Sequence, residues 1–230
     1  INVYAGFYST TAGSYTWSVP AGITAINVAA FGGGGGGGSS NNTNTNGGSG
    51  GGGAAYANGN HTVVPSTLRH YRVGAGGNGG PASSTTAPTS GLPTWLNATG
   101  VNAAPATNVI GTLADFGKAG ANNSTATPTN RGTAAASFGN IATTNGNNGA
   151  AGTANGGGNG GNSAAGAAGN ITWQGTGGAG VNSGVSNPGV IPGGGGGGSN
   201  DNANSAGGAG AAGFIVVTYS FPKLATPTIT

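Results

Sequence analysis

Few side chains in this sequence can do acid–base or metal chemistry, and they are far apart. His61, His70, Asp115 and Asp201 are the complete set, because glutamate and cysteine are absent. Histidines and carboxylates can bind a metal ion or form a catalytic triad when the fold gathers them into one site. Two histidines without clustered acids or thiolates instead favour hydrogen-bonded or solvated structural roles.

Residues 47–51, Gly-Gly-Ser-Gly-Gly, match the G-x-S-x-G nucleophile pattern. A chain with 55 glycines produces this pattern by chance, and the strand-to-helix context of the motif is missing. No lysine follows a glycine run at the spacing of a phosphate-binding loop. A glycosidase would need a pair of suitably placed carboxylates. We therefore predict that the protein is not an enzyme and has no catalytic, cofactor-binding or metal-binding residues and no cofactor.

Charge is sparse, at 3% of the residues with a net charge of +3. The cations are dispersed along the chain, which argues against a nucleic-acid partner; they are Arg69, Arg72, Lys118, Arg131 and Lys223. The longest apolar run is far shorter than the roughly 20 residues of a membrane-spanning helix, so no membrane span is predicted.

Two glycine runs, 32–38 and 193–198, dominate the organisation of the chain. Gly and Pro, 55 and 11 of 230 residues, reach the proportion typical of disordered chains, but the apolar residues gather in strand-like segments. Polyglycine II helices rise about 3.1 Å per residue and have no internal hydrogen bonds, so their backbone groups must bond to neighbouring chains or water. Several such runs can pack as a bundle. Proline is too sparse, and the glycine period too irregular, for collagen.

Strand patterns flank the glycine-rich regions. Aromatic and β-branched residues fill 1–8, alternation marks 15–19, and the apolar segments 23–31 and 214–221 are expected to pair. The predicted fold is mainly β and irregular, with almost no α-helix. A small antiparallel sheet of the N- and C-terminal strands brackets a bundle of polyglycine II helices. We expect long loops with short strands over 82–144.

The segment Trp17 to Thr24, the interrupted glycine blocks and the closing stretch Gly207 to Tyr219 resemble the glycine-rich domains of phage tail-fibre and bacterial surface proteins. The design is also similar to the tip adhesins of tailed phages, which stack polyglycine II helices and bind a receptor through loops. The resemblance covers roughly 15–219. We divide the chain into an N-terminal strand segment, 1–14, a glycine-rich domain, 15–221, and a tail, 222–230.

The leading functional prediction is a structural subunit of an extracellular fibre or surface filament that binds copies of itself by strand addition. The absence of Cys and Met and the low charge fit an extracellular, cell-surface or virion-surface location. The candidate interface residues are Ile1, Val3, Tyr4, Phe7, Tyr8, Ile215, Val217 and Tyr219. Under this hypothesis residues 1–10 pair either within a subunit or between subunits.

The alternative is a phage tail-fibre tip or cell-surface adhesin that binds a glycan or protein receptor. Its candidate loops are 39–46, 54–62, 82–104 and 121–130. The candidate ligand residues are Tyr56, His61, Trp95 and Trp173, whose rings suit sugar or protein contacts; the opposing interpretation is that they cover the glycine bundle. A weaker alternative is ice binding by a flat face rich in Thr and Ala.

Overall fold

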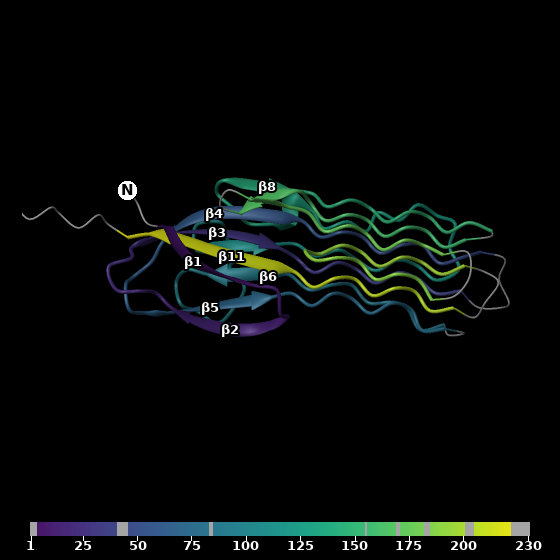
Figure 1. The fold of residues 1–230 in the computed structure, drawn as a ribbon, viewed down its shortest axis with the longest axis horizontal. Coiled ribbons are helices and arrows are strands. Elements are labelled where there is room, and N and C mark those ends of the chain that lie inside the picture. Colours follow the sequence, from purple (N-terminus) through teal and green to yellow (C-terminus); the bar gives the residue numbers. More distant parts are fainter. Residues whose placement is uncertain are drawn as a thin grey trace, which may run out of the picture.

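The computed structural model has two regions, a β-sandwich at one end and a bundle of extended glycine-rich segments at the other (Figure 1). It describes residues 4–40, 46–82, 85–154, 156–168, 171–181, 185–200 and 205–221. These residues contain no α-helix, and the only helical turn among them is the 3-10 helix η1 (Ala134–Ala136). The predicted mainly β and irregular fold is confirmed.

One sheet of the sandwich has five antiparallel strands in the order β1-β11-β3-β4-β8. The predicted pairing of the two apolar segments is present, with Phe214 opposite Phe31 and Thr218 opposite Asn27. The strands are β1 (Tyr4–Ser9), β11 (Phe214–Ser220), β3 (Ala25–Phe31), β4 (Tyr56–Thr62) and β8 (Ala142–Thr144).

The second sheet has four antiparallel strands in the order β2-β5-β6-β7. Alternation sends one face of each sheet into a shared core, where Val28 and Val217 meet Leu96 and Val73. The strands are β2 (Gly13–Ser18), β5 (Leu68–Val73), β6 (Thr94–Asn97) and β7 (Gly111–Ala114). The region 82–144 was predicted to consist of long loops with short strands. It supplies the central strand β6 and the edge strand β7 of this sheet.

A small hairpin covers part of the outer face of the five-stranded sheet. It consists of β9 (Gly166–Ala168) and β10 (Ile171–Trp173). Below it Phe31, Tyr56 and Phe214 form a second apolar cluster. Strands β3 and β4 and the start of β11 are therefore buried on both faces next to the bundle.

The glycine run 32–38 follows β3 directly and has threefold hydrogen bonding. The N–H groups of Gly32, Gly35 and Gly38 all donate to one neighbouring segment. Those of Gly33 and Gly36 donate to a second segment, and those of Gly34 and Gly37 to a third. Its carbonyl groups accept from three more segments. The six neighbours are 49–55, 89–92 and 208–211 as acceptors, and 77–80, 117–120 and 196–199 as donors. This repeat every three residues is that of a polyglycine II helix.

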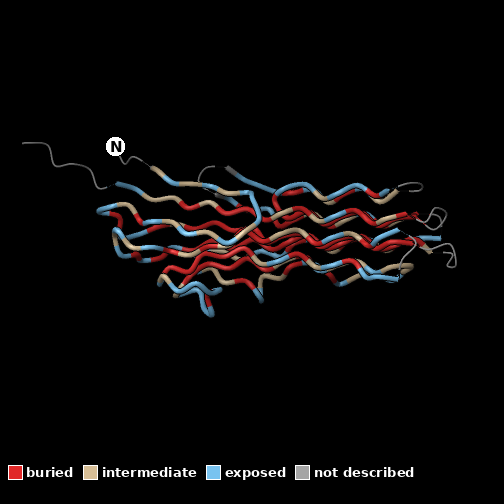
Figure 2. The backbone as a smooth tube through the Cα atoms, turned by 90° about the horizontal axis from the view of Figure 1, so that it is seen from below, coloured by how far each residue is buried: buried red, intermediate tan, exposed pale blue. Residues whose placement is uncertain are grey.

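Three segments, 32–38, 47–55 and 193–199, form the centre of the bundle and bond to one another. Gly35 N–H donates to Gly52 O at 2.9 Å, Gly51 to Gly196 at 2.8 Å and Gly196 to Gly35 at 2.9 Å. All three segments are buried, and they form the buried backbone that runs through the bundle (Figure 2). A side chain has no room there, because a Cβ on Gly35 would overlap the carbonyl of Lys118.

The surrounding segments need glycine only where they face the centre. In segment 145–153, Gly146, Gly149 and Gly152 are the buried positions and the residues between them are more exposed. Asparagine side chains bond to backbone groups at the periphery: Asn162 Oδ1 accepts from Gly177 N–H at 2.8 Å, and Asn159 Oδ1 from Gly180 N–H at 2.8 Å. The abundant asparagine thus complements the backbone where no further segment lies.

Candidate functional site

The edge of the five-stranded sheet at β1 is the site predicted to join subunits. In this structure β1 pairs with β11 of its own chain, from Tyr4 opposite Ser220 to Ser9 opposite Ile215. The ring of Phe7 lies between the sheets, 5.4 Å from Trp17 and 5.1 Å from Tyr71 between ring centroids. Residues 4–14 are therefore held on the sandwich by backbone pairing and by the packing of the Phe7 ring.

The outer side of β1 is open. Tyr8 is 75% exposed, and its ring lies 6.2 Å from that of Phe214. Gly6 lies against the β11 backbone, where a Cβ would overlap the carbonyl oxygen of Val217. A shallow hollow of about 230 Å³ lies beside these residues, lined by both strands. Position 6 thus requires glycine for the two strands to pair closely.

The other predicted interface residues occupy different environments. Ile215 and Val217 are fully buried in the core, so an added strand would contact β11 there through its backbone. Tyr219 packs on Trp17, with ring centroids 5.8 Å apart. Ile1 and Val3 lie outside the described residues.

The four predicted ligand residues lie on strands. Tyr56 and His61 on β4 are each 4% exposed, and Trp95 on β6 is 6% exposed. Trp173 on β10 is 37% exposed and packs on Phe214 with ring centroids 4.9 Å apart. The structure does not bring these residues together on a surface, and the three buried ones support the packing interpretation.

The buried polar side chains of β4, Tyr56, Asn58 and His61, each have at least one local partner. His61 Nε2 lies 2.7 Å from the Thr112 hydroxyl, and burial lowers the pKa of His61, which favours the neutral ring. Asn58 Nδ2 donates to the Tyr56 hydroxyl at 3.0 Å, and the same hydroxyl donates to the Ala167 carbonyl. Burial raises the pKa of Tyr56. These contacts fix the strand within the fold.

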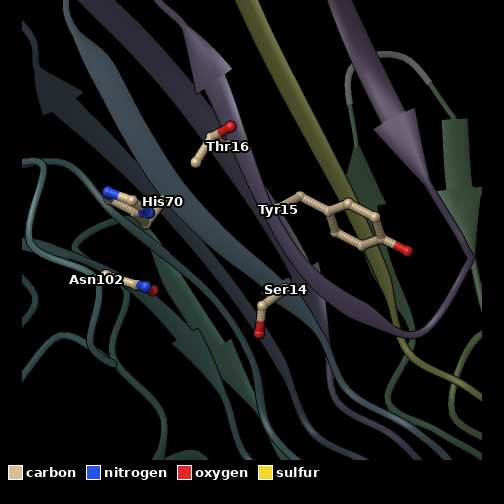
Figure 3. Close-up of a pocket in the computed structure, with 5 residues that line it drawn as sticks. All are labelled: Ser14, Tyr15, Thr16, His70 and Asn102. Carbon is tan, nitrogen blue, oxygen red and sulfur yellow. The ribbon is translucent and has the colours of Figure 1, made fainter.

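A polar hollow on the outer face of β2 and β5 was not predicted from the sequence. Ser14, Thr16, His70 and Asn102 line it (Figure 3), and its volume is about 420 Å³. Thr16 is directly opposite His70 in the sheet. Tyr15 contributes to the wall, but its ring points away and its hydroxyl donates to Thr11 O at 3.0 Å. The sequence signal that could have located it is the alternation of small polar residues with Tyr15 and Trp17, which places the polar side chains on the outer face of the strand.

This hollow offers hydroxyl, amide and imidazole groups and no carboxylate. Within the described part of the chain, no group of three His, Cys, Asp or Glu residues could hold a metal ion. Asp115 accepts from Thr133 N–H at 2.8 Å, a bond that orders the start of η1. The lining of the hollow suits a neutral ligand rich in hydroxyl groups.

A family model described as a glycine-rich domain matches residues 9–220. The chain belongs to this family. The match includes every described strand except the greater part of β1, so the glycine-rich domain comprises both the sandwich and the bundle. A search of curated proteins finds no match. Among the described residues, no helix is long and apolar enough to cross a membrane.

Proposed function

We propose that this glycine-rich domain is a structural subunit of an extracellular fibre, in which β1 of one copy pairs with β11 of the next. The observation that supports this most directly is the position of β1, an edge strand that pairs with β11 and with no other strand in the described part of the chain. A strand that adds to a sheet edge can do so within a chain or between chains with the same contacts. Repeated head to tail, the exchange gives an open polymer.

The connection between β1 and β2 favours exchange. Only residues 10–12 separate the two strands, which lie in different sheets. A three-residue link spans at most about 10 Å, and short hinge loops promote swapping between copies. Straightening this link would carry β1 away from its own sandwich and leave the β11 edge open for the strand of another copy.

The glycine bundle suits a subunit that transmits force along a fibre. Its centre is held by backbone hydrogen bonds in six directions around each central segment. The chain also has few charges to repel neighbouring copies, with 3% charged residues. Such a bundle supplies a stiff spacer between successive sites of strand exchange.

The experiment is a Gly6→Val variant examined by electron microscopy and sedimentation, beside the wild type and a deletion of residues 1–10. We expect regular filaments from the wild type and none from Gly6→Val or the deletion, because a side chain at position 6 overlaps the Val217 carbonyl oxygen and the deletion removes β1. The matched control is Tyr8→Ser on the same strand, which removes an exposed ring and keeps the backbone pairing. Filaments from the deletion variant, or none from the wild type, would refute strand exchange.

A second candidate is a tail-fibre tip or surface adhesin, supported by the polar hollow on β2 and β5. Hydroxyl, amide and imidazole groups there suit a sugar, and Asn102 belongs to the predicted receptor loop 82–104. Glycan-array binding that is lost in Thr16→Val and kept in the bundle variant Asn147→Ala would support an adhesin. An empty array with the wild type would count against it.

A further inference from the structure

One long face of the glycine bundle consists of three segments: 185–191, 205–213 and 74–81. Gly189 N–H donates to Ala209 O at 2.9 Å, and Gly210 N–H donates to Gly77 O at 2.8 Å. The segments therefore lie side by side in a fixed register. The middle one bonds to central segments on its inner side, so its outer side is open.

Every third residue of each segment faces outward on this side, and the nine positions contain one polar residue. Val185 is 70% exposed and Ile191 is 46% exposed. The middle row is entirely alanine, with Ala209 exposed at its centre. The rows are Val185, Pro188 and Ile191; Ala206, Ala209 and Ala212; and Ala75, Asn78 and Pro81.

A second long face has the same backbone lattice and different side chains. It consists of 145–153, 156–164 and 175–181, joined by bonds such as Asn147 N–H to Asn162 O at 2.9 Å and Gly160 N–H to Gly178 O at 2.8 Å. Its outward residues include Asn147, Ala150, Thr153, Asn159, Asn162, Thr176 and Ala179. Because the two backbones are equivalent, the apolar character of the first face comes from its side chains and is not required by the lattice.

We propose that the apolar face, defined by these nine outward residues, packs against the same face of a second copy of the chain. Its relief is self-complementary, because a ridge of Val185, Pro188 and Ile191 runs beside a groove of alanines. A twofold axis places the ridge of each copy in the groove of the other, which is an isologous contact. None of the nine residues is charged, so the two faces meet without burying an ion.

The size of the face indicates where this contact acts. The middle segment, 205–213, extends about 28 Å at the rise of a polyglycine II helix, and the three adjacent segments together give an area of roughly a few hundred Å². Stable complexes bury about 800 Å² on each partner, so two free monomers pair weakly. Copies already joined in a polymer present the face repeatedly, and effective concentration then makes the contact strong. In a polymer, the contact would join neighbouring filaments side by side, and this consequence rests on the proposed fibre function. The pairing of two apolar faces does not depend on it.

The test uses single-cysteine variants, since the chain contains no cysteine. Ala209→Cys places a thiol at the centre of the apolar face, and Ala150→Cys places one at an exposed position of the Asn-rich face. Both proteins are treated at high concentration with a short bismaleimide and analysed as covalent dimers on denaturing gels. We expect Ala209→Cys to crosslink at least about tenfold faster, because the paired faces raise the local thiol concentration.

Equal crosslinking rates for the two variants would overturn the pairing, whether or not filaments form. Selective crosslinking at position 209 without filaments would refute the fibre function and leave the pairing intact. Where filaments form, Ala209→Lys should give single filaments and Ala150→Lys should still give laterally paired ones. Melting temperatures of all variants establish that they fold.

Discussion

The two regions of this molecule are held together in different ways. The sandwich buries large side chains such as Phe31 and Leu96 between and over its sheets. The centre of the bundle has almost no side chains and is held by backbone hydrogen bonds between segments distant in sequence. Removing atoms should therefore damage the sandwich, whereas adding atoms should damage the bundle.

The largest effect is expected from Gly35→Ala in the centre of the bundle. A Cβ there overlaps the Lys118 carbonyl, and six bonded neighbours prevent the backbone from moving aside. We expect a loss of about 3 kcal/mol or more in the free energy of unfolding, or no folded protein, because the surrounding backbone cannot shift to make room for the added atom. Denaturant unfolding measures it.

The control is Gly22→Ala, where an added Cβ meets open space but the backbone has φ +80°. Only the conformational cost of about 1 kcal/mol should appear. Similar losses in the two variants would show that crowding in the bundle is not what requires glycine.

The sandwich should respond to the opposite change. Phe31→Ala removes a fully buried ring that lies 4.9 Å from Tyr56 and 6.2 Å from Phe214. We expect a loss of about 3–5 kcal/mol in the free energy of unfolding, from lost burial and the cavity left behind. Phe221→Ala, at a ring that is 40% exposed, should cost much less. Equal losses would mean that the second apolar cluster is not a core.

The bundle was the part most open to prediction from sequence. A run such as 32–38 has no side chains to form a core, so backbone pairing was its one route to a folded structure, and the strands beside it carried clear apolar patterns. The strands β6 and β7 fall within 82–144, where the sequence predicted long loops with short strands but did not indicate which residues form the strands. Each has four residues, all buried, so no alternation reveals it, and its partners are distant in sequence.

Placement of the candidate ligand residues failed to follow from sequence for a related reason. Tyr56 and His61 lie among polar and small residues typical of a loop, yet β4 is covered on both sides near the bundle. Tyr56 is covered by Phe31, Phe214 and the β9–β10 hairpin, and His61 lies against Thr112 of β7, all of them distant in sequence. The hollow at Ser14 and His70 likewise depends on the register of β2 with β5.

Acid should destabilise the sandwich through His61. Burial lowers the pKa of this ring from its ordinary 6.5, so the unfolded chain binds the proton more readily. Stability should be complete above pH 6.5 and fall as pH drops below it, until the folded ring also titrates. Thermal unfolding from pH 8 to pH 4 measures this, and His61→Gln should flatten the profile; a profile unchanged by this substitution would mean that His61 is not the source of the acid sensitivity. Because the chain has only two acids, few carboxylates compete with this signal.

The smallest effect concerns the rim of the bundle, where side chains and backbone cooperate. Asn162→Ala removes the Oδ1 atom that accepts from Gly177 N–H at 2.8 Å, and should cost about 0.5–1.5 kcal/mol of unfolding free energy. Asn147→Ala is the matched control: it lies beside Asn162 in the neighbouring segment, and its side chain makes no hydrogen bond among the described residues. Faster hydrogen exchange at the Gly177 amide in the first variant alone would show that asparagine completes the backbone network. Unchanged exchange would mean that water replaces the amide at no cost, and that the rim, unlike the centre, is held without its side chains.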